Sequence, residues 1–596
     1  MKFFRTLVAT TLGTLLALFL LFIIILITIV SSTGEPEPYI RDNSVLKIAI
    51  SGDIPSRHIF NPFDEIFGRK DDNRVSLESL KENLAKAASH DKISGVWLEI
   101  DFVEAGWANL QEAHRLISAF RDSSKKFVYA STNDIGLNEK GYFLATAADS
   151  VFSPPESFFE FDGFYSQVMF LTGLFEKLGI DVEVTRHGKY KSAVEPYFRK
   201  ELSEESKYQL EQLVEDITAT FVDAVSAKTG KSSGEINALL NNTPSLSARA
   251  GFEQGLLDTL LYTEGVEKLI KKRLGLKASA SLQTVSNARY TGVSRRTAGL
   301  DVPSTKNKIA VIYAAGAIIP AMNSNSPLDN QQFITAPAFR KQLEEIRNDN
   351  NVKALVVRIN SPGGSASTSD AIWNMLRETT EDLPVIVSMG PVAASGGYYI
   401  AMAADTIVAE PTTITGSIGV FGTKFNARQL FNEELGITFD EVKSHNHADW
   451  LTSTRGFTPS EEKAFQQFID RTYHTFISKA AEARGLSIQE VDKIAQGRVW
   501  TGTDAKDQQL VDILGGLETA IEVAAEKAGI TDYALISFPR QKNLFQFFMS
   551  SAETKVKAML KSLWFGDIFP NEATSQFMLM KNHGPLLLMP FDITIQ

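Results

Sequence analysis

The residue with the clearest chemical potential is a serine in a glycine-rich turn. Ser395 lies in the run Ala394–Tyr398 (ASGGY), which follows an apolar stretch and leads into a helix-like segment. The small neighbours leave its hydroxyl open to a ligand, and the N–H groups of a helix N-terminus favour negative charge. A lone serine before a helix usually caps that helix. Capping does not explain the surrounding glycines, so Ser395 is a candidate nucleophile.

A second pair of glycines follows another apolar stretch. Residues Asn360–Ser365 (NSPGGS) come directly after the run that ends at Ile359. Paired glycines after a strand allow a ligand to approach the backbone N–H groups closely. Gly363 and Gly364 are therefore candidate backbone donors to a bound substrate, although most turns of this kind are only turns.

A serine hydroxyl attacks poorly until a base accepts its proton. None of the eight histidines lies near Ser395 in the sequence. His445 and His447 share one loop with Asp449, which leaves a triad or a metal site there as an alternative. No H-E-x-x-H motif supports zinc. Lysine is the other base that serves a catalytic serine.

The chain contains an internal repeat, which indicates where such a lysine lies. Tyr142–Asp149 (YFLATAAD) matches Tyr398–Asp405 (YYIAMAAD) at an offset of 256 residues. Further pairs occur in the same order: Lys47–Ile50 with Lys308–Val311, Ile93–Ile100 with Val352–Ile359, and Leu174–Ile180 with Leu430–Ile437. Because the order is kept, we interpret the chain as a tandem duplication.

The two copies differ at the residues that could do chemistry. The offset of 256 places Glu139 opposite Ser395. The first copy contains Gly188–Pro196 (GKYKSAVEP), and Ala448 stands opposite Lys191 in the second copy. One copy therefore has the serine and the glycines, and the other has the lysine.

Both copies alternate short apolar runs with amphipathic stretches, which predicts an α/β architecture with covered sheets. We expect buried strands at Val352–Ile359 and Val385–Met389, and helices at Ala338–Asn348 and Pro459–Gly485. The predicted divisions are an N-terminal anchor (1–32), a first repeat (44–280), a linker rich in Ser, Thr and Ala (281–306), a second repeat (307–540) and a hydrophobic tail (541–596). We expect the tail to cover the second core, with a membrane-lying or subunit-contacting segment as the alternatives.

Composition excludes several classes of protein. The 596 residues are 44% hydrophobic and 22% charged, which is typical of globular domains. The net charge of −11, with no basic stripe, argues against nucleic acid as a partner. The chain has no cysteine, so it has neither disulfides nor a thiol nucleophile.

One segment predicts a membrane anchor. Residues 7–30 form an uncharged, mostly apolar run of 24 residues, long enough to cross a hydrocarbon core of about 30 Å. A cleaved signal peptide has a shorter apolar region, so we expect the run to be retained. Lys2 and Arg5 precede it, and Glu35 and Glu37 follow it. The positive-inside rule then predicts a cytoplasmic N-terminus and an extracytoplasmic body.

Together these residues resemble signal peptide peptidase A, also called protease IV, in its long, duplicated bacterial form. The resemblance covers nearly the whole chain, including the anchor. It implies an α/β fold of the crotonase/ClpP-like type built twice, preceded by one transmembrane helix. The matching motifs are Tyr190–Pro196 (YKSAVEP), Ser361–Gly364 (SPGG), Ala394–Tyr398 (ASGGY) and Thr415–Gly419 (TGSIG).

The resemblance also implies a role for each site residue. Ser395 would be the nucleophile, Lys191 the general base, and Ser417 the residue that orients the lysine. The N–H groups of Gly396 and of Gly363 or Gly364 would form the oxyanion hole. A neutral lysine needs its pKa lowered by about 3 units, which burial can supply. The resemblance implies no metal, nucleotide or other cofactor.

The family implied in this way degrades signal-peptide remnants and other short peptides at the membrane. Its long form is a homotetramer, and its body lies outside the bacterial inner membrane. Two alternatives stay open at this point. One is a crotonase-like acyl-CoA hydratase or isomerase, which shares the fold, and the other is a catalytically silent scaffold.

Overall fold

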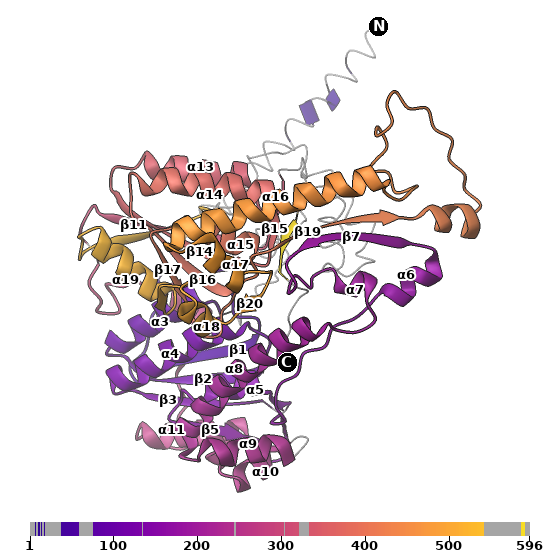
Figure 1. Cartoon of the computed structure of the whole chain (residues 1–596). Coiled ribbons are helices and arrows are strands. Elements are labelled where there is room, and N and C mark those ends of the chain that lie inside the picture. The colour runs from indigo at the N-terminus through magenta and orange to yellow at the C-terminus, as the bar shows by residue number, and fades with distance from the viewer. Residues whose placement is uncertain are drawn as a thin grey trace.

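The computed structural model describes residues 37–58, 75–133, 135–242, 246–302, 304–320, 333–540 and 586–589, and six single residues between 6 and 17. Figure 1 shows the first copy, coloured indigo to magenta, below the second copy, coloured salmon to orange. Each copy has its own large sheet, and a third sheet takes strands from both copies.

The first copy is built on six parallel strands in the order β10-β1-β2-β3-β5-β9. Parallel strands need crossover connections, which helices supply here. The strands are β1 (Ser44–Gly52), β2 (Ile93–Val103), β3 (Phe127–Ser131), β5 (Ser150–Ser153), β9 (Thr259–Leu260) and β10 (Thr284–Ser286), with a small sheet of β4 (Gly136–Leu137), β6 (Phe158–Phe159) and β8 (Leu246–Ser247). The helices are α3 (Leu77–Ser89), α4 (Trp107–Ser124), α5 (Glu139–Ala145), α6 (Thr172–Leu178), α7 (Glu195–Phe198), α8 (Glu204–Thr229), α9 (Ser233–Asn242), α10 (Ala248–Glu253), α11 (Thr263–Arg273) and α12 (Asn287–Thr291).

The second copy repeats this plan, with six parallel strands paired in the order β22-β11-β14-β16-β17-β21. These are β22 (Ala534–Phe538), β11 (Lys308–Ala315), β14 (Val352–Ser361), β16 (Val385–Ala394), β17 (Thr406–Ala409) and β21 (Ile513–Leu514); β18 (Ile414–Gly416) pairs with both β16 and β20 (Val499–Trp500). The helices are α13 (Ala336–Arg347), α14 (Ala366–Thr380), α15 (Gly396–Ala401), η1 (Leu430–Glu434), α16 (Pro459–Arg484), α17 (Ile488–Ile494), α18 (Gly502–Asp507) and α19 (Leu517–Lys527).

The strongest sequence signals correspond to observed elements. The two predicted strands are β14 and β16, each longer at its C-terminal end, and the two predicted helices are α13 and α16. Both ends of α16 carry capping residues that a sequence can show. Thr458 and Glu461 form a capping box, Pro459 occupies the first turn, and Gly485 ends the helix in the left-handed conformation.

The stretch 281–306, predicted as a linker, contributes a strand to the first sheet. Thr284–Ser286 form β10, which pairs with β1 in the way that β22 pairs with β11. A strand of three residues at a sheet edge is too short to show a hydrophobic alternation, so the composition of this stretch concealed it.

The third sheet has the order β13-β12-β15-β23-β19-β7. It consists of β13 (Phe333–Ile334), β12 (Ala317–Ile318), β15 (Gly363–Ser365), β23 (Leu586–Leu588), β19 (Val420–Asn426) and β7 (Asp181–His187). Seven antiparallel pairs join β7 of the first copy to β19 of the second copy, from Asp181 with Asn426 to His187 with Val420. Because the pairing is antiparallel, the residues that follow β7 lie next to those that precede β19.

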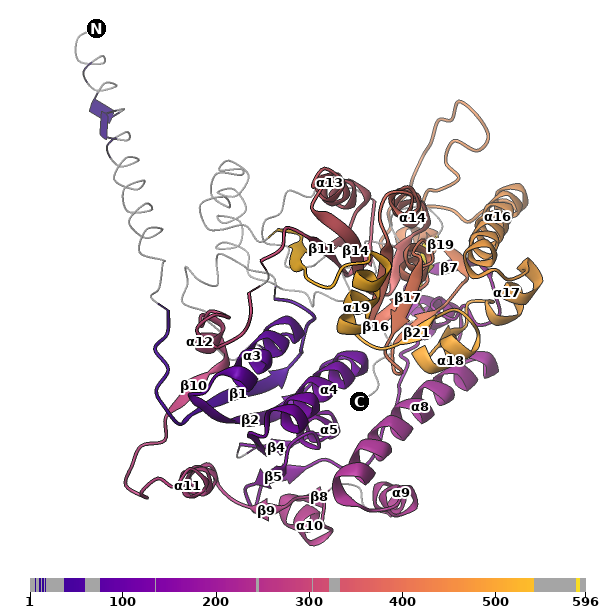
Figure 2. The same cartoon turned by 90° about the vertical axis from the view of Figure 1, so that its left-hand side faces the viewer.

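Helix α4 also contacts the second copy, at β16, and Figure 2 shows it on the side of the first copy that faces the second. Arg358 of β14 reaches Glu112 of α4 at 2.9 Å, with both side chains buried. Arg115 donates to Glu410 at 3.0 Å. The two lobes are therefore held together by paired charges as well as by the shared sheet.

The predicted membrane span at residues 7–30 lies almost entirely outside the described residues. Within the part of the chain that the structure describes, no helix combines the length and the apolar character needed to cross a bilayer.

Candidate active site

Ser395 lies between the end of β16 and the first residue of α15. Its backbone has φ 56° and ψ −111°, a conformation that residues other than glycine rarely adopt. The turn is held by its own N–H, which donates to the carbonyl of Gly416 at 2.8 Å. The Ser395 side chain makes no capping bond to α15, so the helix does not consume its hydroxyl.

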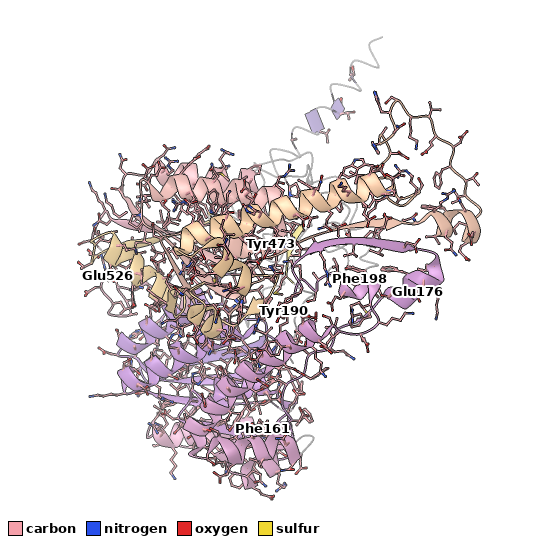
Figure 3. All side chains as sticks on the ribbon, in the orientation of Figure 1. Phe161, Glu176, Tyr190, Phe198, Tyr473 and Glu526 are labelled. Carbon is pink, nitrogen blue, oxygen red and sulfur yellow. The ribbon has the colours of Figure 1, made fainter. Side chains whose placement is uncertain are left out.

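Lys191 reaches this turn from the first copy. It follows the end of β7 by four residues, and Ser417 precedes the start of β19 by three. The β7–β19 pairing therefore brings the two turns together. Lys191 Nζ lies 2.7 Å from Ser395 Oγ, 2.9 Å from Ser417 Oγ and 2.9 Å from the Ser417 carbonyl oxygen. Tyr190, the residue before it, lies in Figure 3 where the ribbons of the two copies meet.

These three contacts match the bonding capacity of a neutral amine, which has two N–H donors and one lone pair. The Ser417 carbonyl can only accept, so it takes one N–H, and Ser417 Oγ takes the other. The lone pair is then directed at Ser395 Oγ. Lys191, Ser395 and Ser417 all have 0% of their surface exposed. Burial lowers the pKa of Lys191 well below its usual value because the charged form loses its hydration.

Residues around Lys191 fix its position. Arg186 of β7 donates to the Lys191 carbonyl at 3.1 Å and lies 3.4 Å from the buried carboxylate of Glu195. Glu195 also accepts hydrogen bonds from the backbone N–H and hydroxyl of Ser203 and from the hydroxyl of Ser206. We call residues 188–195 the lysine loop. The residues at the start of α8 thus hold the lysine loop in place through the carboxylate of Glu195.

The three glycines of the predicted oxyanion hole lie against one another beside Ser395, and the Gly363 N–H itself donates to Ser361 Oγ at 3.2 Å. A Cβ placed on Gly363 would lie 2.8 Å from the Gly396 nitrogen, and one placed on Gly396 would lie 3.1 Å from the Gly364 nitrogen. Gly363 and Gly364 have φ of 105° and 151°, which side chains rarely allow. A side chain on Gly364 would also collide with the Ile318 carbonyl. This close packing explains the paired glycines.

The first copy has different chemistry at the corresponding place. Helix α5 begins at Glu139, and Asn138 caps it by accepting a bond from Gly141 N–H. The Glu139 carboxylate accepts from Asp162 N–H at 2.9 Å, and burial raises its pKa to about 7. The Glu139 carboxylate is thus hydrogen-bonded within the first copy.

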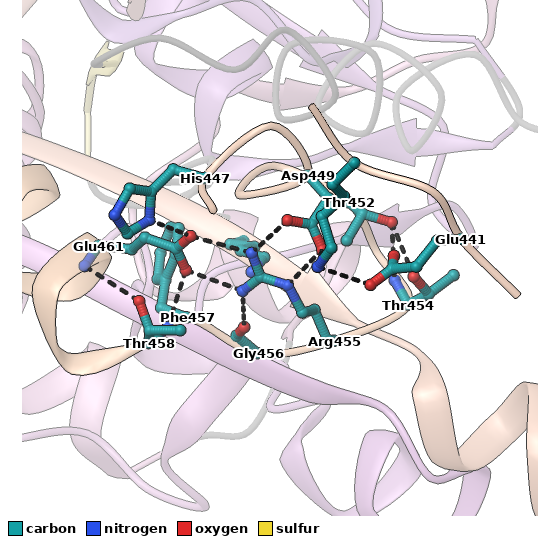
Figure 4. Close-up of polar contacts among 12 residues, drawn as sticks. Glu441, His447, Asp449, Thr452, Thr454, Arg455, Gly456, Phe457, Thr458 and Glu461 are labelled. Atoms are coloured by element: carbon teal, nitrogen blue, oxygen red, sulfur yellow. Dashed lines mark hydrogen bonds and ion pairs between the residues drawn. The ribbon is translucent and has the colours of Figure 1, made fainter. Parts of the chain in front are cut away.

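The histidine loop considered as an alternative site is a network of ion pairs. Figure 4 shows Arg455 between Asp449 and Glu461, with contacts of 2.6 to 2.9 Å. His447 Nδ1 lies 2.9 Å from Glu461, and His445 Nδ1 lies 3.1 Å from Ser444 Oγ. The carboxylates here are occupied by arginine, and the loop belongs to a different part of the fold from Ser395.

Comparison with known proteins agrees with this geometry. The family model of peptidase family S49 matches residues 119–277 and again residues 377–531. The two ranges together make up more than half of the chain and contain Lys191, Ser395 and Ser417. The chain belongs to peptidase family S49. It is a serine peptidase with two S49 regions in tandem, as the internal repeat predicted.

Relatives of this S49 peptidase match along most of its length. The chloroplastic serine protease SPPA of Arabidopsis thaliana is 36% identical over 83% of this chain and 71% of its own. Protease 4 of Salmonella typhi is 32% identical over 83% of this chain and 79% of its own. Protease 4 of Haemophilus influenzae is 28% identical over 85% of this chain and 83% of its own. The predicted family resemblance is confirmed.

A second family model, Clp protease, matches residues 329–414 of the S49 peptidase, which gives the second copy a ClpP-like fold. A ClpP1 mutant from Listeria monocytogenes is similar to 35% of this chain and 94% of its own, with 18% identity and a TM-score of 0.24. The peptidase family match favours proteolysis over acyl-CoA hydration or isomerisation.

Sequence reasoning missed part of the surroundings of this site. Gln209 of α8 donates to Ser192 of the lysine loop and accepts from Val499 N–H of the second copy, a link that sequence spacing does not reveal. Strand β23 was also missed within the tail. Its signal was the short apolar run 586–589 between Pro585 and Pro590, which is typical of a strand.

Proposed function

We propose that this chain is a membrane-anchored serine endopeptidase with a Ser395–Lys191 dyad. Its substrates would be cleaved signal peptides and other short peptides at the membrane. The observation that carries the dyad is the 2.7 Å separation between Lys191 Nζ and Ser395 Oγ, with the lysine fully buried. A hydroxyl next to a neutral amine is the arrangement that activates a serine.

In the first half of the cycle, Ser395 Oγ attacks the carbonyl carbon of the scissile bond. Its proton passes to the lone pair of Lys191 Nζ. As the tetrahedral intermediate breaks down, the C–N bond is cleaved and Lys191 gives the proton to the departing amine. The first product leaves with a new amino terminus, and an ester to Ser395 remains.

In the second half, water attacks the ester carbonyl and Lys191 accepts one of its protons. The ester C–O bond breaks, Ser395 Oγ recovers the proton, and the second product leaves as a carboxylic acid. Ser417 holds Lys191 in place through both halves. Its two contacts use the N–H groups and leave the lone pair free for each proton transfer.

The backbone N–H groups of Gly396 and of Gly363 or Gly364 would stabilise the oxyanion in both halves. Such a donor contributes about 3–4 kcal/mol to the transition state. The convergence of these glycines beside Ser395 supports this role. Backbone donors need no reorganisation when charge develops, because the strands already fix them.

Location and assembly belong to the same proposal. The apolar run 7–30 would anchor the chain in the bacterial inner membrane, with the N-terminus in the cytoplasm and the body in the periplasm. Four chains would form a homotetramer.

Protease treatment of spheroplasts tests the topology: we expect the body to be digested, and a protected body would contradict the proposed orientation. Light scattering in detergent tests the tetramer, and a monomer at working concentration would contradict it.

The dyad is tested by hydrolysis of a fluorogenic peptide in detergent. We expect Ser395→Ala and Lys191→Met each to lower kcat by at least about 1,000-fold with the fold retained. Ser417→Ala should cause a smaller loss, about 10- to 100-fold, because it removes a bond to the lysine and not the lysine itself. Lys189→Met is the matched control, since Lys189 is exposed and lies two residues away.

Full activity in both Ser395→Ala and Lys191→Met would refute the dyad. Absence of hydrolysis by the unaltered chain, with every peptide tested, would favour the silent scaffold. Loss of activity in Lys189→Met as well would mean that the lysine loop responds to any change.

A further inference from the structure

A short turn of the second copy lies between the lysine loop and the turn that contains Ser417. It consists of residues 495–498, which connect α17 to β20, and we call it the support turn. Gln496 and Gly497 both have a positive φ, of 53° and 78°, and a glutamine rarely adopts this conformation. Contacts outside the turn must therefore hold its backbone in place.

Backbone hydrogen bonds join the support turn to both segments of the site. Tyr190 precedes Lys191 in the lysine loop, and Ser417 accepts from the Lys191 amine. The three bonds, of 2.7 to 2.9 Å, run from Tyr190 N–H to the Gln496 carbonyl, from Gly497 N–H to the Ile418 carbonyl, and from Ser417 N–H to the Arg498 carbonyl. Three consecutive residues thus connect the loop that carries the amine with the turn that binds it.

The stem of Lys191 packs directly on the support turn. A Cβ on Gly497 would lie 2.6 Å from Lys191 Cβ and 2.7 Å from its Cα. A Cβ on Gly188 would lie 2.5 Å from the carbonyl carbon of Gln496, and one on Gly419 would lie 3.1 Å from Lys191 Cδ. Because the turn and the lysine are in such close contact, a shift of the turn moves the amine.

Tyr473 of α16, labelled in Figure 3, bonds to the support turn through its hydroxyl. The hydroxyl accepts from Gln496 N–H at 3.3 Å and from the Gln496 side-chain amide at 3.1 Å, and it donates to Asp492 at 2.5 Å. These bonds use the one donor and both lone pairs of a phenol. The Tyr473 ring stacks on His187, the last residue of β7, with 4.0 Å between centroids. One buried side chain therefore contacts both the residue before the lysine loop and the turn packed against that loop.

Charged groups on the surrounding elements have partners other than the Lys191 amine. Among the described residues these pairs are Arg186 with Glu195, His187 with Asp470, Asp492 with Tyr473 and Gln496, and Lys189 and Arg498 with the ring of Tyr190. Burial raises the pKa of Tyr473 above its ordinary value, so its hydroxyl stays protonated over the working range of pH. A change at Tyr473 that alters the pH profile then reports on Lys191.

Building on the proposed function, we propose that Tyr473 is a positioning residue that acts through the support turn to hold the Lys191 amine against its serine partners. The hydroxyl keeps Gln496 in its unusual conformation, and the turn in turn keeps the lysine loop in place. Loss of the hydroxyl loosens this packing, which lets water reach the amine and stabilise its charged form. The neutral form that accepts the proton from Ser395 then dominates only at a higher pH.

The first experiment removes only the hydroxyl. In Tyr473→Phe the ring and its stack on His187 remain, and peptide hydrolysis is measured across pH 5–10. We expect kcat to fall about 2- to 12-fold and the apparent pKa of kcat/KM to rise by about 0.3 to 1 pH unit. KM should change by less than about 2-fold, because the hydroxyl is buried and bonded within the protein. A pH profile equal to that of the unaltered chain would overturn the proposal.

Tyr142→Phe is the matched control. Tyr142 is also fully buried, and its hydroxyl donates to the Leu256 carbonyl at 2.6 Å in the first copy. The change removes the same atom, but the lost partner lies outside the lysine loop and the support turn. We expect kcat and the pH profile to stay as in the unaltered chain. A control that shifts the profile as far as Tyr473→Phe would show that loss of any buried hydroxyl has this effect, and the proposal would fail.

A second variant tests the route through the support turn. Gln496→Met keeps the length of the side chain and removes its bonds to Tyr473 and Asp492. The apparent pKa of kcat/KM should rise as in Tyr473→Phe. The double variant should show no larger rise than the larger of the two single changes, because both act on one turn. Additive rises would show two separate routes and would contradict the proposal.

A third measurement needs no substrate. Lys191 has a depressed folded-state pKa, so its contribution to the free energy of unfolding should begin to rise with pH at that pKa and stop rising near about 10.4. This contribution is the part of the pH dependence that Lys191→Met removes. In Tyr473→Phe the rise should begin at a pH higher by about 0.3 to 1 unit, and an unmoved onset would overturn the proposal. If the unaltered chain cleaves no peptide, the proposed function fails, whereas this onset still decides whether Tyr473 holds the buried amine.

Discussion

At the scale of single residues, the proposed dyad requires Lys191 to be neutral near pH 7. Among the residues that the structure describes, Lys191 has no carboxylate as a hydrogen-bond partner; it contacts the hydroxyl of Ser395 and the hydroxyl and carbonyl of Ser417. Those partners solvate an amine but do not neutralise an ammonium ion. The loss of hydration on burial therefore decides its charge.

This charge state predicts the pH dependence of the rate. Because burial lowers the pKa of Lys191, the active neutral form should dominate at a lower pH than for a solvated lysine. We expect kcat/KM to rise with pH and to level off well below pH 10.4. Peptide hydrolysis across pH 5–10 measures this dependence of kcat/KM on pH. Lys191→Arg should be inactive throughout, since arginine stays protonated. A rate that rises only near pH 10 would contradict the prediction.

The same lysine should affect stability. Its folded-state pKa is depressed, so it costs stability at low pH, and the cost disappears as pH rises toward the unfolded value of about 10.4. Within that window the free energy of unfolding should rise with pH, and Lys191→Met should remove up to about 1.4 kcal/mol per pH unit of this slope. Urea unfolding at several pH values measures the slope. An equal slope in Lys191→Met and in the unaltered chain would show that Lys191 titrates normally.

At the scale of elements, the lysine loop has little regular structure and depends on contacts from β7 and from the start of α8. Glu195 makes most of them, with Arg186 of β7 and with Ser203 and Ser206 at the start of α8. We predict that Glu195→Ala lowers the free energy of unfolding by about 3 kcal/mol and also lowers kcat, because buried donors lose their acceptor.

The Glu195 prediction is measured by urea unfolding together with peptide hydrolysis. Glu195→Gln keeps an oxygen acceptor and should recover part of both quantities. If stability falls and kcat does not change, β7 alone is sufficient to position Lys191.

The elements also show what the sequence could predict. Strands β14 and β16 are buried on both faces, so their apolar runs identified them, and the capped ends of α16 were equally clear. The pairing of β7 with β19 was not predictable. It joins residues more than 200 positions apart in two copies, and neither strand's side-chain pattern specifies its partner.

The candidate site residues could likewise be predicted from the sequence only in part. The glycines around Ser395 and the YKSAVEP run identified the nucleophile and the lysine as candidates, since unusual residues at a strand end are local signals. Their separation was left open, because a distance between copies depends on the third sheet. The positive φ of Ser417 was likewise hidden, as a serine carries no signal for that conformation.

At the scale of the whole molecule, the two copies must keep one relative orientation for serine and lysine to meet. Arg358 Nη2 of β14 crosses the interface to Glu112 and Asn109 of α4, and its Nη1 donates to Ser388 Oγ and the Met389 carbonyl. These groups are buried, so removal of one charge leaves the other without its ion-pair partner.

We predict that Glu112→Leu and Arg358→Met each destabilise the chain by about 3–5 kcal/mol. The double variant should lose less than the sum of the two, because it leaves no unpaired charge at the interface. A double-mutant cycle by urea unfolding measures the coupling energy. Additive losses would show that the two side chains stabilise the fold independently of each other.

The β7–β19 pairing has a consequence for the order in which the chain is made. A ribosome completes Lys191 long before Ser395 and β19 exist. Until β19 arrives, the lysine loop has no cover from the second copy, and its amine remains an ordinary hydrated cation. A half-synthesised chain therefore contains no nucleophile and no base. The two reach their proposed reactive state together, when β19 pairs with β7, so proteolytic capacity begins only once the second copy packs against the first.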